Sequence, residues 1–208
     1  MDSRTEILQK LSQTPTLALD SQKNGTVHVV PNISDDPDEM LARFITEAEK
    51  LTCNIHQVRD EKEAVKEILA LVGSEKRILG WAFDRIGLPG LETALNEASV
   101  HVDESPNPEV RFGVTGADAA LAATGSIVLS SGAGKSRAVS LLPPVHIAVL
   151  RSEQIVQDLE SWVALQKNPT EVSNIFVISG PSKTADIAME LVMGMHGPQE
   201  LNIILINS

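Results

Sequence analysis

Two glycine-containing segments carry the residues best suited to holding a small anion. The first segment contains Ser131, Gly132, Gly134, Lys135, Ser136 and Arg137. Glycines let the backbone approach an anion, while hydroxyls and basic side chains donate hydrogen bonds and supply positive charge. The Walker pattern is absent, because Leu129 stands where it needs glycine and Pro143-Pro144 soon follows the lysine. We expect an anion-holding loop without ATPase chemistry. The alternative is a glycine-rich turn with solvated basic residues.

The second segment contains Gly180, Pro181, Ser182, Lys183, Thr184 and Asp186. It leaves a predicted strand through a glycine and enters a predicted helix at residues 184–193. The first turn of a helix presents unpaired N–H groups, so the segment is a candidate anion site. Ordinary capping by Ser182 or Thr184 explains the same residues without any ligand.

Four further residues are secondary candidates: Asp118, Thr124, His146 and His196. Asp118 lies in a predicted helix and Thr124 directly follows it, and both could reach a ligand or make only turn hydrogen bonds. His146 begins a predicted buried strand, where a hydrogen-bonded core histidine is the alternative to a ligand-binding one. His196 could be an acid–base group or could interact with a helix C-terminus. The histidines lack metal-ligand spacing, so we expect no metal, and no catalytic residue is assigned.

Apolar periodicity predicts the elements that position these residues. The runs IVLS, HIAVL, IFVIS and NIILI are apolar on both faces, which is typical of a sheet covered on both sides. The fold expected is α/β, a three-layer αβα sandwich with a mostly parallel central sheet. Strands are expected at residues 54–59, 77–83, 99–103, 126–130, 145–150, 174–179 and 201–206, and helices at residues 3–11, 40–51, 60–73, 88–98, 117–123, 153–166 and 184–193.

The chain is predicted to form one domain with an outlying arm. Residues 1–35 have weak periodicity and contain Pro15, Gly25 and Pro31, whereas residues 36–208 are regular. Ligands of parallel sheets bind beyond the carboxyl ends of the strands. The loops after Phe83 and Ser130, and the loop after Ser179, are therefore the places to search.

Composition excludes several classes of function. The 208 residues carry 17 basic and 28 acidic side chains, a net charge of −11, which opposes nucleic-acid binding. Cys53 is the single cysteine, so the chain can form neither an internal disulfide nor a cysteine-ligated iron–sulfur cluster. We find no membrane-spanning run and no signal-like start, and expect a soluble cytoplasmic protein without membrane insertion or cofactor.

Several blocks resemble one known family in order and spacing. They are Thr124-Gly125-Ser126, the segment 131–137, Leu142-Pro143, His146-Ile147, and the segments 178–187 and 194–198. Over roughly residues 110–208 they resemble the lactate utilisation protein C family, the single-domain members of the LUD domain group. The resemblance implies a fold similar to the sugar-isomerase and CoA-transferase group. It also implies a role in oxidising L-lactate to pyruvate alongside two iron–sulfur partner proteins.

Two hypotheses about function follow. In the first, the chain is an accessory, non-redox subunit of a lactate-oxidising system. In the second, it is a stand-alone isomerase or acyl-transferase-like enzyme acting on a small carboxylate or phosphate. There Lys135, Arg137 and Lys183 would hold the anion, and Asp118 or Asp186 would act as the base.

Overall fold

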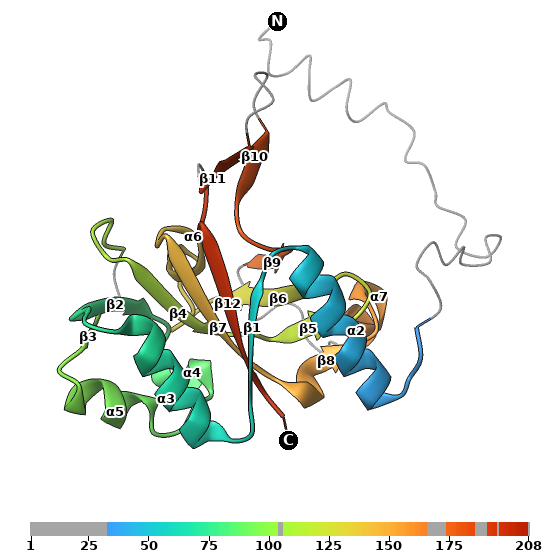
Figure 1. Ribbon diagram of the computed structural model, residues 1–208, viewed down its shortest axis with the longest axis horizontal. Coiled ribbons are helices and arrows are strands. Elements are labelled where there is room, and N and C mark those ends of the chain that lie inside the picture. Colours follow the sequence, from blue (N-terminus) through green and yellow to red (C-terminus); the bar gives the residue numbers. More distant parts are fainter. Residues whose placement is uncertain (1–32, 104–105, 166–173, 186–190, 195, 208) are drawn as a thin grey trace, which may run out of the picture. The chain divides into compact units, whose positions relative to one another are not determined.

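A six-stranded parallel sheet forms the centre of the fold (Figure 1). The computed structural model describes residues 33–103, 106–165, 174–185, 191–194 and 196–207. All five strand pairings of this sheet are parallel, as the sequence predicts. In spatial order its strands are β1 (Asn54–Val58), β12 (Glu200–Ile206), β7 (Val145–Arg151), β4 (Phe112–Gly116), β2 (Arg77–Gly80) and β3 (His101–Asp103).

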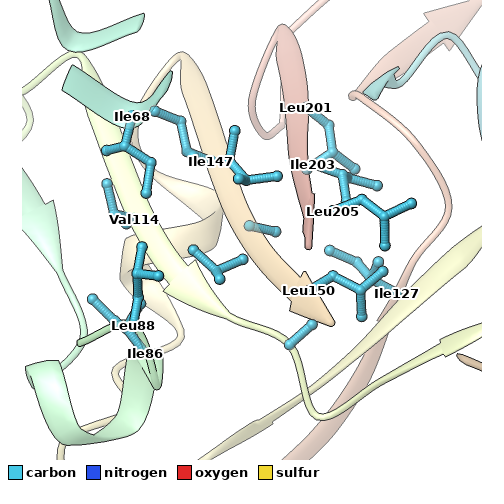
Figure 2. Close-up of a cluster of buried hydrophobic side chains, with 14 of the residues drawn as sticks. Ile68, Ile86, Leu88, Val114, Ile127, Ile147, Leu150, Leu201, Ile203 and Leu205 are labelled. Carbon is cyan, nitrogen blue, oxygen red and sulfur yellow. The ribbon is translucent and has the colours of Figure 1, made fainter. Parts of the chain in front are cut away.

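Both faces of this sheet are covered. The six residues from Leu201 to Ile206 in β12 are all buried, and successive side chains of a strand point to opposite faces. Figure 2 shows the aliphatic side chains that fill part of this core, among them Ile147, Leu150, Ile203 and Leu205. The expected α/β sandwich with a parallel central sheet is confirmed.

Helices pack against this sheet. Helix α3 (Glu61–Val72) contacts β1, β12 and α5 (Leu91–Glu97), while α4 (Phe83–Ile86) and α6 (Ala138–Leu141) contact β4. Helix α2 (Pro37–Lys50) contacts β1.

Local sequence explains where the longer helices begin and end. The Asp36 carboxylate accepts hydrogen bonds from the first turn of α2, at 2.9 Å from Asp38 N and 3.2 Å from Glu39 N. Asp60 caps α3 through Glu63 N, and Gly73 ends that helix in a positive-φ conformation.

A second, four-stranded sheet packs beside α2 and carries the first candidate loop. Strand β5 (Ala119–Leu121) pairs antiparallel with β6 (Ser126–Ser131), which pairs antiparallel with β9 (Asn174–Ile178). On its other side β5 pairs parallel with the short β8 (Ile155–Val156). The helix expected over residues 117–123 is therefore wrong, because pairing with both neighbouring strands overrides the helical preference of alanine.

Strand β4 is absent from the sequence-based prediction. Its two glycines weaken a strand pattern, but packing requires them. A Cβ atom at Gly113 would lie 2.0 Å from Val139 O, and one at Gly116 would lie 2.9 Å from Ile86 O. The two glycines thus let α4 and α6 approach the backbone of β4 closely, while β4 pairs with β7 and β2 inside the sheet.

The helix expected over residues 184–193 is also wrong. Strands β10 (Lys183–Ala185) and β11 (Leu191–Met193) pair antiparallel instead. Hydrogen bonds from Ser182 N to Pro198 O and from Gly194 N to Ser182 O extend the contact between the two segments beyond these strands. The described part of this segment, residues 180–185, is therefore not a helix N-terminus.

Smaller boundaries also differ from the prediction. Strand β2 ends at Gly80, because the residues expected to extend it to position 83 instead lead into α4. Helix α5 begins at Leu91 rather than at residue 88, after Gly90 in a left-handed conformation. The helix expected over 153–166 divides into a 3-10 turn η1 (Ser152–Gln154), strand β8 and helix α7 (Leu159–Leu165). The helix expected at 3–11 and most of the expected arm lie outside the described residues.

Candidate functional site

The loop after β6 forms a tight turn that carries Lys135 and lies against the loop after β2. Gly132 and Lys135 exchange two backbone hydrogen bonds, of 3.2 and 3.0 Å. Gly134 takes a positive φ of 73°, and its carbonyl accepts a hydrogen bond of 2.9 Å from Ala82 N. The indole N–H of buried Trp81 donates to Ser136 O at 3.0 Å. The loops after β2 and β6 are thus joined directly.

The Lys135 ammonium lies among three different partners. Its Nζ donates to Asp118 Oδ1 at 2.5 Å and to Ser130 Oγ at 3.2 Å. It also lies 5.0 Å from the centre of the Trp81 ring, within the range of a cation–π contact. Ser130 N donates to the other Asp118 oxygen, which orients that carboxylate. The lysine and aspartate side chains are 19% and 24% exposed, so both remain accessible from a cavity.

This Lys135–Asp118 pair borders a cavity of about 330 Å³ at the carboxyl ends of β2, β4 and β7. The cavity walls carry three basic residues, Arg85, Lys135 and Arg151, and two acidic ones, Asp84 and Asp118. The lining thus holds one more basic than acidic residue, although each of the three cations is paired with a carboxylate. The cavity lies where parallel sheets bind their ligands.

The arrangement has a defined chemical capacity. Lys135 is a hydrogen-bond donor and positive charge for a carboxylate or phosphate, and Asp118 is a base within reach of the same space. Arg151 is held by Glu61 Oε1 at 2.6 Å and by Gly87 O at 3.1 Å. Its position is therefore fixed before any ligand arrives.

The first candidate segment is partly assembled as predicted. Asp118 and Lys135 meet, and Ser131, Gly132, Gly134 and Ser136 shape the turn that positions the lysine. Arg137 is exposed and precedes α6 without lining the cavity. Sequence reasoning missed Trp81, Arg85 and Arg151. Arg151 is the last residue of β7, so its place at a carboxyl end was the signal that could have found it.

The second group of candidates lines a different cavity, of about 220 Å³. His146, His196, Gly180, Pro181 and Ser182 all contribute to its walls.

The remaining candidates that the structure describes do not line either cavity. The Lys183 ammonium donates to Leu51 O at 3.1 Å, and Thr124 Oγ1 donates to Ser126 Oγ at 2.9 Å. Thr184 belongs to β10, and Asp186 lies outside the described residues.

Antiparallel pairing separates the two candidate segments. In the β6–β9 pair Ser131 lies opposite Asn174, and Ile127 lies opposite Ile178. The loop after β6 and the loop after β9 therefore leave opposite ends of this pair, which four strand residues separate by roughly 14 Å. The structure does not bring Lys135 and Lys183 to one ligand.

Two buried groups have strongly shifted pKa values. Burial lowers the pKa of the His146 imidazole to about 3, so the ring is neutral at pH 7. Burial also raises the pKa of the Cys53 thiol to about 11, against a smaller opposing effect of Lys183. Among the described residues no group of three histidine, cysteine or carboxylate side chains could hold a metal ion. No helix in the described ranges is long and apolar enough to cross a membrane.

Residues 41–206, most of the chain, match the LUD domain. The chain belongs to the LUD domain family. This LUD domain protein is 35% identical over 164 residues to lactate utilization protein C of a Geobacillus species, covering 70% of this chain and 68% of that protein. The same-named protein of Halalkalibacterium halodurans is 31% identical over 178 residues, covering 77% and 76%.

The crystal structure of a DUF162 family protein from Deinococcus radiodurans has a similar fold. The TM-score is 0.62 at 26% sequence identity, over 82% of this chain and 98% of that one. Both Lys135 and Asp118 fall within the region that matches the LUD domain. The candidate site is therefore part of the family's domain rather than of the segment before it.

Proposed function

We propose that this LUD domain protein acts in lactate utilisation as a non-redox subunit that works with iron–sulfur partner proteins. The similarity to proteins named lactate utilization protein C, over 70% or more of the chain, carries the proposal. The oxidation of lactate releases two electrons that must pass to an acceptor. The chain's single cysteine cannot bind a cysteine-ligated cluster, so cysteine-ligated iron–sulfur centres would have to lie on partner chains.

The cavity beside Lys135 is the site that we assign to a small carboxylate ligand of this system. The ammonium group and the nearby Arg85 and Arg151 supply positive charge, and Trp81 shields one side of the lysine. A carboxylate entering this cavity would share Lys135 with Asp118. Binding should therefore weaken when Lys135 loses its charge.

The direct test is affinity purification of the tagged chain from cells of its source grown on L-lactate. Iron–sulfur proteins should co-purify, and the recovered complex should reduce a dye when lactate is added. The isolated chain should show no lactate-dependent reduction. Strong activity of the isolated chain would overturn the proposal.

A stand-alone isomerase or acyl-transferase-like enzyme is the second candidate function. The contact of Lys135 with Asp118 beside a cavity of about 330 Å³ supports it, because such a pair can hold an anion and move a proton. Fold similarity is only a weak guide to activity, so the chemistry of the site must decide.

Paired variants distinguish this enzyme from the subunit. Substrate screening of the isolated chain should reveal a turnover that Asp118→Asn abolishes and that Lys50→Gln leaves unchanged. Lys50 is a suitable control because its side chain is 64% exposed and forms an ion pair with neighbouring Glu47. Co-purification with iron–sulfur proteins and no turnover by the chain alone would exclude the enzyme.

A further inference from the structure

Strand β9 is an open edge of the four-stranded sheet. In the described part of the chain it pairs with β6 on one side and with no strand on the other. Its residues, Asn174–Ile178, include no charged side chain and no proline. Natural proteins usually protect an open edge with lysine, proline or a bulge, because an unprotected edge pairs with another strand. The free edge of β9 is therefore suited to pairing with a further strand.

The hydrogen bonds of β6 show which main-chain groups of β9 face this open edge. Val128 O accepts from Asp118 N, and Ser130 N donates to the Asp118 carboxylate, so both β6 residues direct these groups toward β5. Val177 and Ile175 lie opposite them in β9. In an antiparallel ladder, pairs that exchange hydrogen bonds alternate with pairs that do not. Ile175 and Val177 therefore direct their N–H and C=O groups away from β6.

The same two residues expose apolar side chains. Ile175 is 40% exposed and Val177 is 42% exposed, whereas Phe176 between them packs against the main core. No main-chain group of the described residues outside β6 hydrogen-bonds Ile175 or Val177. The edge of β9 thus presents four free main-chain groups and two β-branched side chains. A strand added to this edge would pair with both.

The sequence of β9 is complementary to itself when two copies run antiparallel. If a two-fold axis passes beside Phe176, each Ile175 lies opposite Val177 of the partner subunit, and Phe176 lies opposite its own copy. The outward-facing groups of residues 175 and 177 then exchange four hydrogen bonds. Each β-branched side chain also meets another, a pairing that stabilises sheets. The net charge of −11 opposes self-association, but no charged side chain of β9 meets a like charge in this register.

We propose that two copies of this chain associate through β9, which joins their four-stranded sheets into one continuous sheet. The two-fold axis passes between the two Phe176 residues. The contact is small beside the roughly 800 Å² per chain of a standard interface, so the dimer is weak, with a dissociation constant in the micromolar range. The proposal is independent of the lactate role and of the ligand at Lys135.

The dimer also adds a residue beside the cavity of about 220 Å³. That cavity lies at the amino ends of the central strands, because His146 and Leu201 in its walls are the second residues of β7 and β12. Val177 belongs to its wall as well. Ile175 of the partner subunit, opposite Val177, therefore lies next to this cavity. The cavity beside Lys135 is not lined by any residue of β9, so dimer formation should leave ligand binding there unchanged.

Sedimentation velocity of the full chain, at concentrations from about 1 to about 300 μM, tests the association. The sedimentation coefficient should rise with concentration from that of a monomer to that of a dimer. A monomer at every concentration would overturn the proposal, and so would a trimer.

Two exposed valines provide matched variants. Val177 is 42% exposed in β9, and Val163 is 56% exposed in α7. Val177→Lys should weaken the dimer at least tenfold, because it places a charge against the partner's Ile175, while Val163→Lys should leave association within twofold. Equal effects of the two changes would overturn the assignment to β9. Both positions are exposed, so folding should be retained.

A single introduced cysteine tests the register. In the proposed pairing the two Phe176 residues form a pair without hydrogen bonds, whose Cα atoms lie about 4.5 Å apart, within the range that a disulfide spans. Phe176→Cys should therefore give a disulfide-linked dimer on mild oxidation, whereas the natural Cys53 is buried. Ile178→Cys is the control on the same face, because its two copies would lie roughly 14 Å apart.

Disulfide linkage through position 178, or through neither position in folded protein, would overturn the register. If Phe176→Cys does not fold, the two valine variants still decide whether β9 forms the contact. Failure of the affinity purification on lactate affects only the proposed function, so the two failures are distinguishable.

Discussion

Lys135 illustrates how one residue acquires a chemical role from its surroundings. Its ammonium contacts Asp118, Ser130 and the Trp81 ring, although its side chain remains 19% exposed. An exposed ion pair contributes little to stability, but a partly buried one leaves an unpaired charge when a partner is removed. The effect of substitution should therefore reveal how far the site is shielded from water.

Lys135→Met should lower the free energy of unfolding by roughly 1–3 kcal/mol. Methionine retains much of the apolar stem against Trp81, so the change removes mainly the charge. Lys50→Met, which removes an exposed ion pair with Glu47, should change stability by about 0.5 kcal/mol or less. Urea denaturation of both variants measures the difference. Equal losses would mean that Asp118 is fully solvated.

His146 should make the stability of the protein depend on pH. Burial lowers the pKa of its imidazole from 6.5 to about 3. Between these values the unfolded state binds a proton that the folded state does not bind. The free energy of unfolding should therefore fall as pH falls below about 6.5, by up to about 1.4 kcal/mol per pH unit from this group.

His146→Gln should remove this part of the pH dependence. Urea midpoints between pH 8 and pH 4.5 measure it in both proteins, and carboxylates contribute equally to each. The curves should converge as pH falls, because only the histidine protein loses stability through imidazole protonation. Parallel curves would contradict a buried neutral imidazole.

The turn between β5 and β6 packs directly against α2. Gly125 has a φ of 66°, and a Cβ atom there would lie 2.2 Å from Ala48 N in α2. The backbone of the turn therefore touches the backbone of the helix. Nothing larger than glycine fits without a shift of one element.

Gly125→Ala should destabilise the protein by about 2 kcal/mol or more. Gly87→Ala is the control, because Gly87 has a similar φ of 71° but nothing within 4 Å of an added Cβ. It should lose only about 1 kcal/mol, from the left-handed conformation itself. Thermal unfolding of the two variants separates the cost of the close contact with α2 from the cost of a left-handed backbone conformation at alanine. Similar melting temperatures would argue against the close approach.

At the scale of the whole molecule, the two cavities lie at opposite ends of the strands of one parallel sheet. The cavity at the carboxyl ends of the strands is lined by Lys135 and two arginines, and the cavity at the amino ends is lined by the neutral His146. A parallel sheet allows two such cavities, because the amino ends of all its strands lie on one side and their carboxyl ends lie on the other. The domain therefore has two separate cavities, one at each end of the strands.

The boundary of the domain can be tested by shortening the chain. We propose that residues 36–208 form the domain, but Ile33 is 8% exposed and belongs to the core. Its carbonyl also accepts a hydrogen bond of 2.9 Å from Gln157 Nε2. Removal of residues 1–35 should therefore lower the free energy of unfolding by roughly 1.5–3 kcal/mol more than removal of residues 1–32. Equal stability in urea would place the boundary at residue 35.

The short strands were harder to predict than the long helices and strands. Strong apolar periodicity identified α2, α3, β7 and β12, because each buries a continuous face or both faces. Alanine-rich β5 and hairpin strand β10 were assigned to helices, although their antiparallel partners β6 and β11 follow closely in the chain. Local preference cannot register such pairing.

The sequence by itself determined the parallel α/β core, the glycine turn around Lys135 and the lack of a cysteine cluster. These follow from residue type and short-range spacing. Tertiary structure alone decided that Lys135 meets Asp118, 17 residues earlier, and that the loops after β6 and β9 lie apart. Both outcomes depend on antiparallel pairing of β6 with its neighbours. Pairing is set by packing of whole strands, which no short segment encodes.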